Sequence, residues 1–253
     1  MGLTARGLRT DMPSAPDGPS ESAAPEGSGR GIGLAEETRR LLALDCLEAA
    51  PQLLGAVISA TDSAGTVSVR LTEVEAYRGE QDPGSHAYRG PTARNASMFC
   101  AGGVIYVYFT YGMHHCVNVV TGPEGVSRAV LLRGGEVVEG LELARSRRPA
   151  ARSDRDLARG PARLCRALGL SLDDDGVALG APGSRVSLAL AEPGTAPAPD
   201  AVRTGARTGV SGPGGDGRLY PWRFWIDGEP TVSPYRAAAP RRARRGGASP
   251  GGL

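Results

Sequence analysis

Apolar and polar residues alternate along residues 67–77, which is the pattern of a β-strand with one buried face. Because side chains on a strand point to opposite faces in turn, this alternation predicts that Glu73, Glu75 and Tyr77 point the same way. A shorter run, residues 57–60, is also expected to be a strand, with a turn-forming segment between the two. The end of the longer strand therefore presents two carboxylates and an aromatic ring together.

Two further apolar runs, residues 104–110 and 115–120, are rich in β-branched and aromatic side chains. Such residues favour strands, and the short link between the two runs is typical of a hairpin turn. We expect Tyr111 to lie at the tip of this hairpin.

The rest of the pattern predicts helices and shorter strands around this region. Helical spacing is found at three places, residues 34–55, 136–148 and 160–169. The third begins with Gly-Pro and ends with Gly, as helices often do. Strands are expected at four more places, residues 127–133, 186–190, 203–210 and 222–226.

Two segments have no such period. Residues 78–100 form a long polar connection, and loops of this length in compact domains are usually functional or disordered. Residues 211–217 are rich in glycine but lack the spacing of a phosphate-binding loop, so we interpret them as a plain linker.

With 253 residues, of which 40% are apolar, the chain is large enough for one domain with a proper core, and we expect that domain at residues 34–236. Residues 1–33 contain few large apolar side chains, which predicts a disordered tail, and residues 237–253 are expected to be a second, basic tail. An apolar run of about 18 residues is missing, as is the apolar segment of a signal peptide. We therefore expect a cytoplasmic protein with no membrane partner.

The net charge is only +2, but positive charge is concentrated in places. Residues 145–166 include eight arginines against two aspartates, and the C-terminal tail adds more arginine. These clusters suit a polyanionic partner, although a solvated helix face and a disordered tail would explain them equally well. All 29 basic residues are arginine, so a mechanism that needs a lysine side chain, such as a Schiff base or a P-loop, is excluded.

The four cysteines are scattered through apolar sequence without a C-x-x-C pair, which favours buried thiols over disulfides or metal ligands. His114, His115 and Cys116 are consecutive, but neighbouring residues on a strand face opposite sides and cannot converge on one ion without a bulge. We therefore expect no metal site.

Several motifs occur in one order along the chain. They are Glu73-Val74-Glu75-Ala76-Tyr77, a loop with Asp82 and His86, Thr92-Ala93-Arg94-Asn95, Tyr106-Val107-Tyr108-Phe109-Thr110-Tyr111-Gly112-Met113, Cys116-Val117-Asn118, Ala129-Val130-Leu131-Leu132-Arg133, Gly160-Pro161-Ala162-Arg163-Leu164-Cys165-Arg166-Ala167-Leu168 and Pro221-Trp222-Arg223-Phe224. Together they resemble the alkyladenine (3-methyladenine) DNA glycosylase family in its bacterial form, over roughly residues 45–236. Several motifs in a fixed order are more specific evidence for a family than any single motif.

The resemblance implies a pocket for a purine that is flipped out of duplex DNA. In the family the hairpin-tip tyrosine, here Tyr111, enters the minor groove and fills the gap left by the base. Tyr77 and His86 would be the stacking walls, Tyr108 would complete the pocket, and Asn118 would crowd the position of a guanine amino group. Taken singly, each of these residues has an ordinary structural explanation, and only their joint occurrence favours the site.

The resemblance also implies the catalytic group. Glu75 would take a proton from the attacking water and stabilise an oxocarbenium-like transition state. Glu73 lies two residues away on the same predicted face, and the residues alone do not choose between the two; the family pattern favours Glu75. Arg133 would orient the water or an adjacent phosphate.

From the family we expect a mixed α/β (α+β) fold: one domain with a curved, largely antiparallel β-sheet, flanking helices and a protruding hairpin. The expected reaction is hydrolytic release of alkylated or modified purines from duplex DNA by a monomer without metal or organic cofactor. The missing lysines independently argue against a lyase activity. Two alternatives stay open: a non-catalytic module that binds distorted nucleic acid, and a glycosidase that acts on free nucleosides.

Overall fold

The computed structural model describes Met1 and residues 34–110 and 112–238 of the chain. Nearly all of the two expected tails, residues 1–33 and 237–253, lies outside these residues, and so does Tyr111. The α-helices are α1 (Glu36–Leu42), α2 (Cys46–Gln52), α3 (Leu141–Arg147) and α4 (Pro161–Leu168). The strands are β1 (Val57–Asp62), β2 (Gly65–Tyr77), β3 (Ile105–Thr110), β4 (His114–Val120), β5 (Ala129–Glu139), β6 (Val186–Ala189), β7 (Val202–Gly205) and β8 (Arg223–Ile226).

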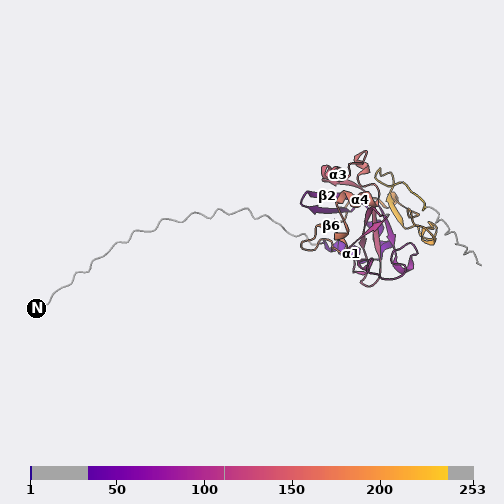
Figure 1. Ribbon diagram of the computed structural model, residues 1–253, viewed down its shortest axis with the longest axis horizontal. Coiled ribbons are helices and arrows are strands. Elements are labelled where there is room, and N and C mark those ends of the chain that lie inside the picture. The colour runs from indigo at the N-terminus through magenta and orange to yellow at the C-terminus, as the bar shows by residue number, and fades with distance from the viewer. Residues whose placement is uncertain (2–33, 111, 239–253) are drawn as a thin grey trace, which may run out of the picture. The chain divides into compact units, whose positions relative to one another are not determined.

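The strands of the described residues form one sheet in which every pairing is antiparallel. Its main path runs β3-β4-β5-β2-β1-β6, and β8 pairs with both β2 and β7. Strand β2 is the longest, and helices α2, α3 and α4 all contact it (Figure 1). A single α+β domain with a largely antiparallel sheet is thus confirmed, whereas the projection of the β3-β4 hairpin stays a prediction.

The segment from Glu73 to Glu75 is paired on both sides, by β5 and by β8, and the side chains of both glutamates are buried. The register of β2 against β5 shifts at Glu73, opposite Gly134. A Cβ atom at Gly134 would lie 2.9 Å from the carbonyl oxygen of Thr231 and 3.2 Å from Oε2 of Glu73. Glycine at this position therefore leaves the room that the Glu73 carboxylate occupies.

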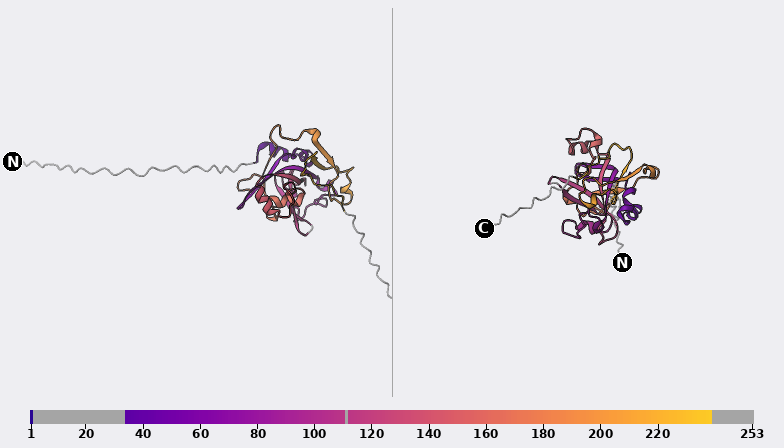
Figure 2. Two further views of the ribbon diagram at one scale, coloured as in Figure 1. Left: turned by 90° about the horizontal axis from the view of Figure 1, so that it is seen from above. Right: turned by 90° about the vertical axis from the view of Figure 1, so that its right-hand side faces the viewer.

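Helix α4 contacts β4, β5 and β2 and carries four buried residues toward them, Leu164, Cys165, Ala167 and Leu168. It starts at Pro161 and ends before Gly169, whose φ of 70° is left-handed, so the expected Pro and Gly boundaries are confirmed. Helix α3 lies beside α4, and the views in Figures 1 and 2 agree on this arrangement. The arginines of residues 145–166 lie on these two helices and on the segment between them.

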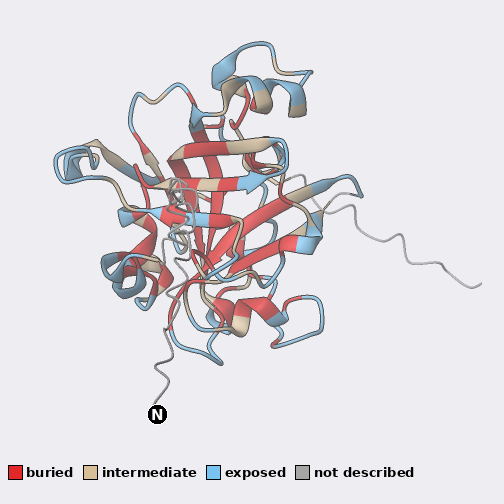
Figure 3. Cartoon of the chain, turned by 90° about the vertical axis from the view of Figure 1, so that its left-hand side faces the viewer, coloured by how far each residue is buried: buried red, intermediate tan, exposed pale blue. Residues whose placement is uncertain are grey.

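Buried residues concentrate along the central strands and the inner faces of the helices (Figure 3). The main cluster includes the apolar side chains of β2, namely Val67, Val69, Leu71, Val74 and Ala76. These residues do not alternate with exposed ones over the second half of β2, because the sheet is covered on both faces there.

Some expected boundaries are wrong. The helix expected at residues 136–148 starts only at Leu141, because β5 continues to Glu139 along the extended edge of β2. Arg70 pairs with Glu136 at 2.8 Å, and Ser68 donates a hydrogen bond of 2.6 Å to Glu139, which holds this extension in place. Gly140, in a left-handed conformation, then ends the strand.

Two other segments are shorter than expected. The helical region at residues 34–55 is divided into α1 and α2, and the carboxylate of Asp45 caps α2 by accepting from the Leu47 N–H at 3.0 Å. The strand expected at residues 203–210 ends at Gly205. Beyond it, Arg207 and Thr208 turn toward the carboxylates of other segments instead of pairing with a strand.

Candidate active site

A cavity of about 290 Å³ opens where strands β2, β3, β4 and β5 meet the loop that follows β7. Five of the residues expected in the site line it, namely Tyr77, His86, Tyr108, Asn118 and Arg133. The other lining residues are Pro83, Gly84, Met98, Tyr106, Thr110, Cys116, Leu131, Pro161, Thr208, Gly209, Val210 and Ser211. Segments that are far apart in the sequence are therefore brought together at one hollow.

Aromatic rings form one side of the cavity. The rings of His86 and Tyr108 are 4.6 Å apart between centroids and nearly perpendicular, at 87°. Tyr106 stacks on Tyr108 at 5.4 Å, and its hydroxyl lies 3.2 Å from Nδ1 of His86. Sequence reasoning did not select Tyr106, although alternation along β3 places it on the same face as Tyr108.

Glu75 is fully buried, yet it lies in a polar network rather than among apolar side chains. The hydroxyl of Tyr77 donates to Oε2 at 2.9 Å, Nη1 of Arg133 donates to the same oxygen at 3.3 Å, and the backbone N–H of Thr208 donates to Oε1 at 2.6 Å. All three donor residues line the cavity. The Glu75 carboxylate therefore lies directly behind the cavity wall.

Glu73 has different surroundings, although it lies on the same strand. Its carboxylate accepts from Nε of Arg133 at 3.0 Å, Nε of Arg223 at 2.6 Å, and the N–H and hydroxyl of Ser233 at 2.7 and 3.0 Å. Burial alone would raise the pKa of Glu73, but the charges of the two arginines and the hydrogen bonds from Ser233 outweigh it and lower the pKa. Glu73 is thus held as a fully paired anion.

Arg133 joins the two carboxylates. Its Nε donates to Glu73, its Nη1 to Glu75, and its Nη2 to the hydroxyl of Ser233 at 3.3 Å. Burial would lower the pKa of the Arg133 guanidinium, but the charges of Glu75 and Glu73 outweigh it and raise the pKa. The side chain is 6% exposed and lines the cavity, so a permanent positive charge faces this space.

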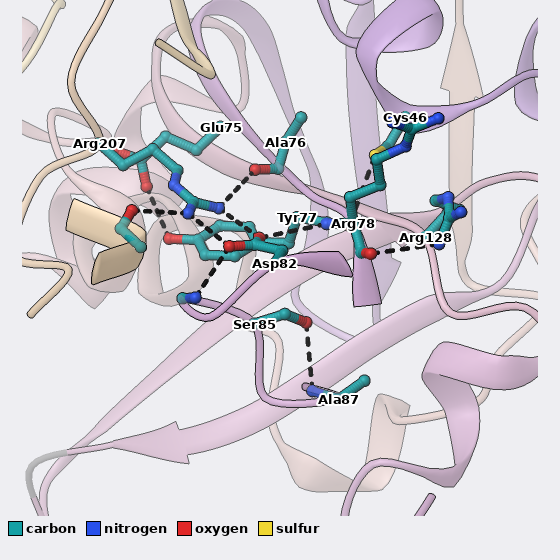
Figure 4. A network of polar contacts seen from close by, with 12 residues as sticks. Cys46, Glu75, Ala76, Tyr77, Arg78, Asp82, Ser85, Ala87, Arg128 and Arg207 are labelled. Atoms are coloured by element: carbon teal, nitrogen blue, oxygen red, sulfur yellow. Dashed lines mark hydrogen bonds and ion pairs between the residues drawn. The ribbon is translucent and has the colours of Figure 1, made fainter. Parts of the chain in front are cut away.

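Arg207 is a site residue that sequence reasoning missed. It is fully buried, forms a two-pronged ion pair with Asp82 at 2.5 and 2.6 Å, and lies over the ring of Tyr77 with its Cζ 4.6 Å from the centroid (Figure 4). The strand expected at residues 203–210 carried no signal for a buried charge. Only its contact with Asp82, which lies 125 residues earlier in the chain, identifies Arg207 as a buried charge next to the cavity.

Asn118 is 3% exposed and lies on β4 next to the cavity. Its Nδ2 donates to the backbone oxygen of Tyr106 at 3.2 Å, which fixes the side chain across the hairpin. The amide is therefore held rigidly where it meets the cavity.

The titratable groups around the cavity favour their neutral forms, apart from the ion pairs. Burial raises the pKa of Tyr77 and Tyr108 well above the usual range and that of Tyr106 to about 12. Burial and the charge of Arg94 lower the pKa of His86, so its imidazole is neutral at pH 7. The aromatic side of the cavity is therefore uncharged.

A second hollow, of about 610 Å³, adjoins the first and shares Arg133, Pro161 and Thr208 with it. Five more arginines line it, namely Arg148, Arg152, Arg159, Arg163 and Arg236. Asp156 is the carboxylate among its lining residues. This arginine hollow is therefore strongly positive and adjoins the cavity.

On the β3-β4 hairpin, the described residues nearest the tip include Phe109, which is 38% exposed, and Met113, which is 70% exposed. Tyr111 itself lies outside the described residues.

Across residues 34–110 and 112–238, no group of three or more histidine, cysteine, aspartate or glutamate side chains is placed to hold a metal ion. In the same part of the chain, none of the helices combines the length and apolar character that crossing a membrane requires.

Comparison with known proteins places these residues in a wider context. Residues 40–230 match the family model of methylpurine-DNA glycosylase. A protein of Streptomyces avermitilis, provisionally named a 3-methyladenine DNA glycosylase, is 57% identical over 207 residues, which cover 82% of this chain and 95% of that protein. Relatives with the same name from Leifsonia xyli and Nocardia farcinica are 53% and 50% identical and cover 81% and 77% of this chain, and 95% and 89% of their own lengths.

Proposed function

The chain belongs to the methylpurine-DNA glycosylase family, and we propose that the cavity between β2, β3, β4 and β5 is where it releases a damaged purine. As a DNA glycosylase it is a DNA repair hydrolase that cleaves N-glycosyl bonds. The proposed substrate is an alkylated or otherwise modified purine, such as 3-methyladenine, in duplex DNA. The proposed product is an abasic site.

A purine inside a duplex cannot reach a cavity of this kind unless its nucleotide is first flipped out of the stack, at a cost of a few kcal/mol. Tyr77, His86 and Tyr108 are the proposed stacking surfaces for the extruded base. Their rings are uncharged at neutral pH, as the pKa shifts described above require. A neutral aromatic wall accepts the π-face of any purine and attracts one that carries a positive charge.

Glu75 is the proposed general base, and the observation that carries the assignment is that all three of its hydrogen-bond donors line the cavity. A carboxylate oxygen has two lone pairs, and Oε1 accepts one described hydrogen bond, from Thr208, so it can accept another from water. Proton transfer to a positioned base contributes about 10² to 10⁴-fold to a rate. The negative charge would also stabilise positive charge that develops on the sugar.

Glu73 is the weaker candidate for this role. Four donors already occupy its two oxygens, and apart from Arg133 the residues that supply them do not line the cavity. We propose that Glu73 acts as a structural anion that fixes Arg133. Arg133 in turn orients Glu75 and has N–H groups left to donate to water or a phosphate.

Asn118 is proposed to select among purines by crowding the position of a guanine amino group. The hydrogen bond to the Tyr106 carbonyl holds its amide in place, so the amide cannot turn aside easily. Rejection of this kind is partly steric, and it is worth about 1 to 3 kcal/mol in typical pockets.

The arginine hollow is proposed to bind phosphates of the duplex, since it is positive and adjoins the cavity. Tyr111, outside the described residues, is proposed to fill the gap left by the flipped base. The exposed side chains of Phe109 and Met113 near the same tip are consistent with a surface that meets bases.

The proposed reaction needs water, a carboxylate and a bound base, with no metal or organic cofactor. Because the chain has no lysine, no side-chain amine is available for the Schiff base of a lyase, so we propose a monofunctional enzyme. We also propose that it acts as a monomer, since one nucleotide is handled at a time. Its proposed location is the cytoplasm.

Single-turnover excision from a duplex with one 3-methyladenine or 7-methylguanine tests the proposal. Glu75→Gln should bind the lesion duplex as tightly as the wild type and release base roughly a hundredfold more slowly, or slower still. Glu80→Gln, which changes an exposed glutamate, is the matched control and should cut normally. Normal cutting by Glu75→Gln would reject Glu75 as the base, and binding without any release by the wild type would instead favour a non-catalytic binding module.

A further inference from the structure

The ion pair of Asp82 and Arg207 lies behind the proposed stacking wall, Tyr77. The guanidinium is over the Tyr77 ring, with Cζ 4.6 Å from the centroid, whereas Tyr77 lines the cavity and Arg207 does not. The cation is therefore on the side of the ring away from the cavity. Arg207 and Asp82 are both buried, at 1% and 0% exposure. Figure 4 shows the two side chains next to Tyr77.

The pair is fixed by several hydrogen bonds. Nη1 of Arg207 donates to Oδ2 of Asp82 and to the Ala76 carbonyl at 3.0 Å, and Nη2 donates to Oδ1 of Asp82 and to the Gly214 carbonyl at 2.8 Å. Asp82 also accepts from the backbone N–H of Gly84 at 2.8 Å and of Arg78 at 3.2 Å. Neither charge can turn toward solvent without breaking these bonds, so both stay at fixed positions behind Tyr77.

A base stacked on the cavity side of Tyr77 would lie roughly 3.5 Å beyond the ring, at the usual distance between carbon atoms in contact. Its ring would then be about 8 Å from the guanidinium carbon. At this separation, with an effective dielectric constant of about 20, one full charge changes the affinity of the pocket for a charged base by on the order of tenfold or more. A lone Arg207 would therefore act strongly against a purine that carries a positive charge.

Stability gives no sufficient reason for such a pair. A buried ion pair is often no more stabilising than apolar residues of the same shape, because both charges lose their hydration. An apolar side chain would support the ring of Tyr77 as well. The position of the pair relative to the cavity suggests a role in the choice of substrate instead.

We propose that Asp82 and Arg207 determine the charge preference of the base pocket, with Asp82 cancelling the positive charge of Arg207 behind Tyr77. The wall can then accept cationic purines as well as neutral ones. This inference rests on the proposed function, in which Tyr77 stacks on the extruded base. Neither residue touches the substrate, so both act through Tyr77 and the electrostatic field of the pocket.

Two single substitutions should move the charge preference in opposite directions. Asp82→Asn leaves the cation of Arg207 uncompensated, so the ratio of single-turnover rates for 7-methylguanine, which is cationic, over a neutral lesion should fall by on the order of tenfold. Arg207→Gln leaves the anion of Asp82 uncompensated, so under the same conditions the ratio should rise. Hypoxanthine or ethenoadenine, whichever the wild type releases, serves as the neutral lesion; if it releases neither, affinities for the lesion duplexes are compared instead.

Asp174→Asn is the matched control, because Asp174 is also a buried carboxylate with a two-pronged arginine partner, Arg185 at 2.6 and 2.7 Å, and does not line the cavity. This variant should keep the wild-type ratio, whatever it loses in stability. If only one of the two test variants folds, the inference is judged by whether the rate ratio of that variant changes in the expected direction.

An unchanged ratio in a folded Asp82→Asn or Arg207→Gln variant, or a shift in the opposite direction, would overturn the inference. The proposed function is judged separately by the wild type, which must release 7-methylguanine from duplex DNA. Release by the wild type with unmoved ratios in the variants would reject the charge role of the pair and leave the base pocket intact.

Discussion

The hydroxyl of Tyr77 donates a hydrogen bond of 2.9 Å to Oε2 of Glu75. The two residues are two positions apart on β2, so the alternation of the strand brings the proposed stacking wall and the proposed base to the same side. A base that stacks on Tyr77 is thus held in a fixed relation to the carboxylate. In the proposed mechanism, binding and bond cleavage are thus linked through a single strand.

Replacing Tyr77 by phenylalanine keeps the ring and removes this hydrogen bond. A hydrogen bond to a charged group contributes about 1.5 to 3 kcal/mol, so the excision rate should fall roughly ten- to a hundredfold. Lesion affinity should change little, because the stacking surface remains. Single-turnover rates and binding to a lesion duplex measure the two effects separately, with the exposed Tyr235→Phe as control. Equal losses in affinity and rate would show that the hydroxyl serves binding instead.

Glu73→Gln should affect stability more than chemistry. It removes the anion between Arg133 and Arg223 and leaves two buried cations less well paired, which costs about 3 to 5 kcal/mol in typical proteins. Urea unfolding should show this loss, whereas the exposed Glu80→Gln should be within error of the wild type. A stable variant without activity would instead make Glu73 the general base.

The lowered pKa of Glu73 also predicts how the protein responds to acid. In the unfolded chain this carboxyl titrates near the usual value for glutamate, and in the folded chain at a lower pH. Its contribution to stability is therefore complete above the usual value and is lost as the pH falls through the lowered pKa. Unfolding free energies measured from pH 7 downward should fall less steeply in Glu73→Gln than in the wild type.

His86 should limit activity on cationic bases at acidic pH. Burial and the charge of Arg94 lower its pKa, so the ring becomes charged only as the pH falls below the ordinary range for histidine. A charged wall then repels a cationic base. Excision of 7-methylguanine by the wild type should therefore decline in acid more than excision by His86→Phe, whose ring cannot be protonated. Parallel pH profiles for the two proteins would contradict this role.

The arginine hollow should contribute to DNA affinity through phosphates. Arg152→Gln and Arg163→Gln remove exposed charges that line it. Each should weaken binding to lesion-bearing and undamaged duplexes alike, and reduce the slope of log affinity against log salt by about one for each arginine that pairs with a phosphate. Arg39→Gln, an exposed arginine on α1, is the control. A salt slope unchanged in both hollow variants would place the duplex elsewhere.

Much of the fold could be predicted from local sequence, and part of the candidate site from the family that the ordered motifs resemble. The strand β2, the paired strands β3 and β4, and the Pro and Gly boundaries of α4 depend on near neighbours, and all were expected where they occur. Five of the seven expected site residues line one cavity, and they were selected through the family resemblance of the ordered motifs. The roles of these residues stay predictions.

Local sequence could not show how distant segments complete the site. It placed Glu73 and Glu75 on one face, but the difference between them comes from partners more than 50 residues away: Ser233 and Arg223 for Glu73, and Thr208 for Glu75. It also missed the continuation of β5, which depends on the edge that β2 offers.

By itself, the sequence determined most of the strands and helices, although not the end of β5 or of β7, and it excluded lysine chemistry. Only the tertiary structure decided which carboxylate lies behind the cavity and that Arg207, buried against Asp82, supports the ring of Tyr77. The physical reason is that the residues next to a charged side chain in the sequence do not show whether that side chain will be buried. Its burial becomes tolerable only when folding brings an opposite charge and hydrogen-bond partners from elsewhere in the chain.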